Sequence, residues 1–122
     1  MGKDEETKIH ELKKKVKEFC DERDWAQFHN AKELAIALSI EASELLEHFR
    51  WKSHEETDSL FNDKKKREEI EDELADILYF LMRISQLYNI DLSNIFDRKM
   101  EQNKKKYPID KFKGSGKKYN EL

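Results

Sequence analysis

The sequence contains two pairs of carboxylates, each within an otherwise apolar helical segment. The two members of each pair are three residues apart. Glu41 and Glu44 lie in ELAIALSIEASELLEHF (residues 33–49), and Glu73 and Asp76 lie in EDELADILYFLMRI (residues 71–84). Residues at this spacing project from one face of a helix. Four carboxylates meeting in a semi-buried cleft would lose hydration and repel one another. A bound divalent cation removes both penalties.

Mg²⁺ is the cation that suits this set of oxygen ligands. It typically keeps waters and substrate phosphates in its coordination shell. We therefore predict a Mg²⁺ site formed by Glu41, Glu44, Glu73 and Asp76. The alternative is that these acids make ordinary surface ion pairs with some of the 24 lysines and arginines, which contribute little to stability. The apolar setting of both pairs favours the metal site.

The elements that position these acids are predicted to be helices. One proline and three glycines interrupt the chain, no strand-like alternation is present, and the apolar residues fall in helical stripes. We predict helices over residues 5–23, 31–51, 63–88 and 92–107, with a capping box from Asn30 to Glu33 and a loop over residues 53–63. The predicted fold is an all-α bundle of four helices, with the acidic pairs on the two central ones.

Length and composition predict one domain over residues 1–112, followed by a flexible basic tail over residues 113–122. Residues 31–50 are apolar over more of the helix circumference than a small monomer can cover, so we expect a homo-oligomer. The single cysteine, Cys20, lies on an apolar stripe and is predicted to be a core residue. Without a signal peptide or membrane span in the sequence, we expect a cytoplasmic protein with no membrane partner.

Four segments together resemble the MazG-like superfamily of all-α nucleoside triphosphate pyrophosphohydrolases, and in detail the dCTP pyrophosphatases. They are WAQFH (residues 25–29), IEASELLEHFRWK (40–52), EDELADILYFL (71–81) and DLSNIFDRKMEQNKKKYP (91–108). The resemblance implies Mg²⁺-dependent hydrolysis of a nucleoside triphosphate to the monophosphate and pyrophosphate. It also implies a dimer or tetramer that clears dCTP or related modified deoxynucleotides from the nucleotide pool.

A substrate site follows from the same resemblance. In similar proteins the matching residues lie around the base (Trp25, His29 and Trp51) or around the phosphates (Lys99, Asn103 and Tyr107). Phe80 stands one turn past Asp76 on the carboxylate face, and we interpret it as lining the base or sugar pocket; dCTP-specific relatives tend to place a tyrosine there. The alternative for the tryptophans is a packing role at helix ends.

Pyrophosphohydrolysis needs a neutralised triphosphate, an oriented water and a stabilised leaving group. The metal would supply the first. Helical spacing places both Glu44 and Glu47 to orient or deprotonate the water, and the sequence does not separate them. Lys99 would hold the charge that develops on the departing pyrophosphate.

Two other functions are open from the residues alone. One is a non-catalytic helical interaction module with an acidic recognition face; no nucleic-acid-binding motif is present, so no stable nucleic-acid partner is expected. The other is a di-iron bundle, which would need Glu-x-x-His on two helices. That pattern occurs at neither acidic pair.

Overall fold

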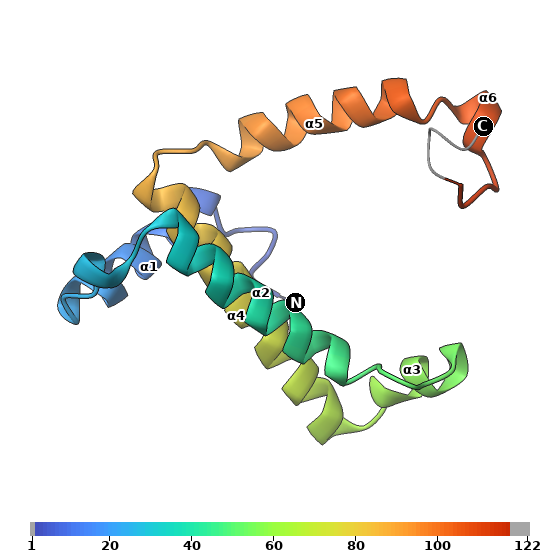
Figure 1. Cartoon of the computed structure of the whole chain (residues 1–122), viewed down its shortest axis with the longest axis horizontal. Helices are drawn as coiled ribbons and strands as arrows, with labels where there is room; N and C mark the ends of the chain where they lie inside the picture. The colour runs from blue at the N-terminus through green and yellow to red at the C-terminus, as the bar shows by residue number, and fades with distance from the viewer. Residues whose placement is uncertain (1, 118–122) are drawn as a thin grey trace. The chain divides into compact units, whose positions relative to one another are not determined.

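The computed structural model describes residues 2–117, and all regular secondary structure in this range is helical. The all-α prediction is therefore confirmed, but the described residues form six α-helices where four were predicted. In chain order the elements are α1 (Ile9–Glu22), the 3-10 helix η1 (Ala26–Phe28), α2 (Ala31–Glu47), α3 (His54–Leu60), α4 (Lys64–Leu87), α5 (Leu92–Lys106) and α6 (Ile109–Phe112) (Figure 1). Over the range that the structure describes, no helix is long and apolar enough to cross a membrane.

Side-chain caps fix where the long helices begin. Asn30 Oδ1 accepts a hydrogen bond from the Glu33 backbone N–H at 2.9 Å at the start of α2. Asp63 caps α4 and Asp91 caps α5 in the same way. Each cap satisfies a backbone donor that has no partner within the helix. The predicted starts of these three helices are confirmed.

The predicted loop over residues 53–63 is wrong, because most of it forms α3. Ser53 Oγ accepts from the Glu56 N–H, and the Glu56 carboxylate accepts from the Ser53 N–H, each at 3.1 Å. This reciprocal capping box satisfies two donors at once. The signal was present in the sequence as Ser-x-x-Glu, but the segment is too polar to show an apolar stripe. Helix α2 also ends earlier than predicted, at Glu47.

The chain divides into two compact units, Met1–Asn89 and Ile90–Leu122. In the first unit both α1 and α2 pack against α4, so α4 is the central helix. Helices α2 and α4 run antiparallel, joined through α3 (Figure 1). Cys20 is completely buried, which confirms its prediction as a core residue. The side chains buried in this unit are Cys20, Leu34, Ile70, Met82, Arg83 and Ser85.

The second unit contains α5 and α6. The rings of Tyr107 and Phe112 pack edge to face with centroids 4.9 Å apart. A shallow pocket beside them is lined by Lys104, Tyr107, Ile109 and Asp110. Of the predicted tail, residues 113–117 follow α6 without further helix, and residues 118–122 lie outside the described residues.

Large apolar side chains remain exposed on the helices that form the first unit. Ile36 and Ile40 of α2 and Leu74 and Leu78 of α4 all present much of their surface to solvent. Apolar patches of this kind on a small protein mark surfaces that another molecule covers. The exposed side chains of α2 agree with its sequence, which is apolar over more of the helix circumference than a small monomer can cover.

Candidate metal centre and substrate site

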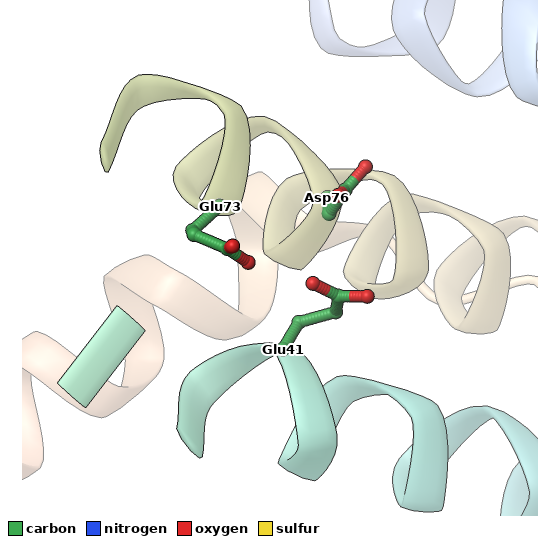
Figure 2. A group of neighbouring side chains, drawn as sticks. All are labelled: Glu41, Glu73 and Asp76. Atoms are coloured by element: carbon green, nitrogen blue, oxygen red, sulfur yellow. The ribbon is translucent and has the colours of Figure 1, made fainter. Parts of the chain in front are cut away.

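Three carboxylates meet between α2 and α4. One oxygen each of Glu41, Glu73 and Asp76 lies within 4.8 Å of the other two. Figure 2 shows Glu41 reaching from α2 towards Glu73 on α4, with Asp76 one turn further along α4. Glu41 follows the buried Leu34 by two helical turns, so it lies on the side of α2 that packs on α4. Helix packing thus brings together acids that are far apart in the sequence.

Two buried oxygens of this cluster have no hydrogen-bond partner: Glu41 Oε2 and Glu73 Oε2. Buried polar atoms are normally paired, and an unpaired buried charge is costly. A hard divalent cation takes carboxylate oxygens as ligands and would satisfy both atoms. The residues present therefore fit Mg²⁺.

The electrostatics of the cluster show the same crowding. The pKa of Glu41 is raised to about 7. The largest cause is a hydrogen bond between the Glu41 and Glu73 carboxyl groups, which needs a proton; burial comes next, followed by the hydrogen bond with Glu44 and the charges of Glu44 and Asp76. Without a cation, the cluster therefore holds a proton below a pH of about 7 and loses it above that pH. Glu44 contributes to the raised pKa of Glu41, although it is not one of the three clustered acids.

His48 is a neighbour of this cluster that the sequence-based predictions did not include. Its Nε2 lies 4.0 Å from Glu73 Oε1, and both side chains are less than one-fifth exposed, at 18% and 19%. The signal in the sequence is its spacing, seven residues after Glu41 and four after Glu44, which places all three on one stripe of a helix. When protonated, His48 offsets part of the negative charge of Glu73.

Three residues at the end of α2 and just after it, Glu47, Arg50 and Trp51, lie at the surface. Glu47 forms an exposed ion pair with Arg50 at 3.1 Å and is not one of the three clustered acids. Trp51 is 87% exposed, and the Arg50 guanidinium carbon lies 4.9 Å from its ring centroid. The backbone of Trp51 has φ +66°, a left-handed conformation that is costly for a bulky residue. An aromatic ring held outward at such a position is available to a ligand.

Trp25 and His29 lie beside the other end of α4. Trp25 is 37% exposed and its ring packs edge-on against Phe19, with centroids 5.5 Å apart, and against His29 at 6.2 Å. Arg83 of α4 donates from Nε to His29 Nδ1 at 3.0 Å. Arg83 is a second residue that the predictions did not include. Its spacing of seven residues from Asp76 puts it on the carboxylate face of α4.

The remaining predicted substrate residues divide between the two units. Phe80 is half-buried in the first, with its ring 4.9 Å from that of Tyr79. Lys99 and Asn103 lie on α5 and Tyr107 is its C-cap residue, all in the second unit. The Asn103 carbonyl accepts the Tyr107 backbone N–H at 2.9 Å. The roles of these four residues stay predictions.

Comparison with known proteins gives three findings. Residues 36–122 match the MazG-like family. The chain is 35% identical over 117 residues to dCTP pyrophosphatase 1 of Rattus norvegicus, covering 96% of this chain and 69% of the rat protein, and 33% identical over the same length to the Homo sapiens protein of that name. A crystal structure of a pyrophosphatase from Archaeoglobus fulgidus superposes with a TM-score of 0.76 at 38% identity, covering 82% of this chain and 92% of that chain.

The raised pKa of Glu41 predicts the pH dependence of stability in the absence of divalent cations. The folded state holds this proton up to a pH of about 7, whereas the ordinary value is 4.5, so the free energy of unfolding should fall as pH rises between them. Glu41→Gln should remove this slope and raise stability at pH 8 by roughly 1 to 2 kcal/mol, with no gain at pH 4. Urea unfolding in EDTA measures the effect.

Glu47→Gln is the matched control, since it removes an exposed acid from the same helix. It should leave the slope between pH 4.5 and 7 unchanged. Parallel pH profiles for wild type and Glu41→Gln would contradict the crowding of charge at Glu41.

Proposed function

Because the chain belongs to the MazG-like family, we propose that it is a Mg²⁺-dependent pyrophosphohydrolase that converts a nucleoside triphosphate to the monophosphate and pyrophosphate. The observation that carries the proposal is the group Glu41, Glu73 and Asp76, with two buried oxygens that lack a partner. The similarity to dCTP pyrophosphatases supports dCTP or related modified deoxynucleotides as the substrate. Its role would be to clear such nucleotides from the pool.

In this proposal Glu41, Glu44, Glu73 and Asp76 hold the ion. When bound, Mg²⁺ would neutralise charge on the triphosphate and polarise the reacting phosphoryl group. Glu44 is the better supported candidate to orient or deprotonate the attacking water, because it acts on Glu41 electrostatically. Glu47 is instead engaged by Arg50 at the surface.

The substrate itself would be held by aromatic and polar side chains outside the carboxylate cluster. Trp51 supports this assignment best, since its exposed ring stands on a strained backbone. A base can stack on such a ring. The residues proposed to contact substrate are Trp25, His29, Trp51 and Phe80 for the nucleoside and Lys99, Asn103 and Tyr107 for the phosphates.

We also propose that the chain works as a homo-oligomer, a dimer or a tetramer. The support is the exposed apolar surface of α2 and α4, represented by Ile36, Ile40, Leu74 and Leu78. Burying such side chains against a second copy would remove apolar surface from water.

The alternative, a non-catalytic interaction module with an acidic recognition face, is less well supported. A recognition face presents its charges to a partner at the surface. Here Glu41 Oε2 and Glu73 Oε2 are buried between two helices of the same chain. A small ion fits there better than a protein surface does.

Asp76→Asn or Glu73→Gln should abolish Mg²⁺-dependent release of pyrophosphate from dCTP, because each removes a proposed metal ligand. Both should also reduce the gain in thermal stability that Mg²⁺ gives the wild type by mass action. Pyrophosphate release from a panel of canonical and modified triphosphates, with circular dichroism to verify folding, measures this. Glu71→Gln is the control, since Glu71 pairs with Arg67 at the surface. Unchanged turnover in either ligand variant would sink the metal-site assignment.

Lys99→Ala should weaken binding of a non-hydrolysable triphosphate by about tenfold to a hundredfold, because a charge-assisted bond is lost. Binding of the monophosphate product should be almost unaffected, since it lacks the β and γ phosphates. Isothermal titration with both ligands tests this. Lys105→Ala, at an exposed position of the same helix, is the control. Equal losses for both ligands would place Lys99 against the nucleoside instead.

Ile36→Lys should lower the molar mass of the protein in solution, because a charge at this exposed apolar position opposes its burial by another copy. Size-exclusion chromatography with light scattering measures the mass. A wild-type protein that is monomeric at all concentrations would contradict the proposed oligomer.

A further inference from the structure

Arg83 is the largest fully buried side chain in the described part of the molecule, with 1% of its surface exposed. It has no carboxylate partner among the described residues. Its Nε donates to His29 Nδ1 at 3.0 Å, its Nη1 donates to Gln86 Oε1, and its Nη2 is buried without any partner. Burying a guanidinium with neutral partners is costly. Such an arrangement calls for an explanation beyond packing.

The bond to His29 determines where the proton of the imidazole lies. A guanidinium can only donate hydrogen bonds, so His29 Nδ1 must be the acceptor and carry no proton. The neutral ring then has its proton on Nε2. Burial, and then the charge of Arg83, lower the pKa of His29, so the neutral form persists at physiological pH.

His29 Nε2–H is a donor that the chain leaves open. None of the described residues forms a hydrogen bond with it, and it is not one of the buried atoms without a partner. The half-exposed ring of Trp25 stands beside it, with centroids 6.2 Å apart. An aromatic ring beside a single directed polar group is typical of small-molecule sites.

The position of Arg83 on α4 indicates how far the His29 Nε2–H donor lies from the carboxylates of the same unit. Arg83 follows Asp76 by seven residues, which is two turns of α4 and roughly 10 Å along its axis on the same face. An extended nucleoside triphosphate can span that distance. With its phosphates at the acids, its base would lie near His29.

We propose that Arg83 is a positioning residue that holds His29 as a hydrogen-bond donor, so that this end of the site selects a base that presents an acceptor. The inference rests on the proposed function, for which cytosine is the base. The acceptor edge of cytosine is formed by N3 and O2. In uracil and thymine N3 carries a hydrogen and cannot accept, so a donor directed at N3 distinguishes cytosine from them, whereas a donor directed at O2 does not.

The tautomer of His29 can be measured without any reference to activity. The full chain with Mg²⁺ and ¹⁵N-labelled histidine has four histidines, and His29→Gln identifies the signal of His29. At pH 7 the proton should be on Nε2 in the wild type. Arg83→Met should give a mixture of tautomers and a higher pKa for His29. A proton on Nδ1 in the wild type, or an unchanged tautomer in Arg83→Met, would overturn the proposal.

Selection of the base is tested with dCTP and two analogues, 2-thio-dCTP and 3-deaza-dCTP, each of which weakens or removes one acceptor. The wild type should lose roughly two- to tenfold in kcat/KM on at least one of them, mainly through KM. Arg83→Met should lose this discrimination, and Arg83→Lys, which keeps a donor, should recover part of it. Arg83→Lys also keeps the test open if Arg83→Met does not fold.

Tyr88→Phe is the control for a merely structural effect. It removes the 2.8 Å bond from the Ala31 N–H to the Tyr88 hydroxyl at the same end of α4 without touching His29. It should preserve both the tautomer and the discrimination, and equal effects of Tyr88→Phe and Arg83→Met would overturn the proposal. If the wild type releases pyrophosphate from no triphosphate, the proposed function and the selection of the base fail together. The tautomer measurement then still decides whether Arg83 positions His29.

Discussion

The repulsion among acids enclosed between α2 and α4 is the constraint on which the site depends. Apolar contacts around residues such as Leu34 and Ile70 hold helices of the first unit together, and burial of this kind is the main stabilising term in folding. Glu41 and Glu73 lie where that packing forces their carboxylates to share one space. The raised pKa of Glu41 reflects this arrangement, first through the hydrogen bond with Glu73, then through burial, and then through the neighbouring acids Glu44 and Asp76. A proton relieves part of the repulsion, and a divalent cation would relieve more.

Helical periodicity predicted from the sequence that acids of α2 and α4 meet, although it also included Glu44, which lies outside the group of Glu41, Glu73 and Asp76. The cap at Asn30 predicted the start of α2, and spacing along each helix predicted the face on which the acids lie. The antiparallel pairing of α2 with α4 then needed only a short connection. The connecting segment, residues 53–63, was wrongly predicted to be a loop. Helix α3 depends on local capping at Ser53 rather than on an apolar stripe, so periodicity could not reveal it.

His48 and Arg83 could not be assigned from the sequence because their roles depend on contacts between separate segments. Spacing puts each on a stripe with the acids, but it does not say which atom of another element it meets. His48 reaches Glu73 across the helix pair, and Arg83 reaches His29 in the segment before α2. A long cationic side chain within an apolar run is usually expected to extend to solvent. Complete burial of Arg83 is therefore something that only the structure shows.

His48 and Arg83, which periodicity did not assign, make the two ends of the carboxylate face of α4 chemically different. At Glu73 and Asp76 the face is acidic, and His48 at the end of α2 lies beside Glu73. Two turns later, at Arg83, it carries a buried guanidinium that fixes which nitrogen of His29 donates. A ligand that matches both ends must bring a cation with its anionic part and an acceptor on its neutral part. A metal-bound nucleotide has these two parts in that order.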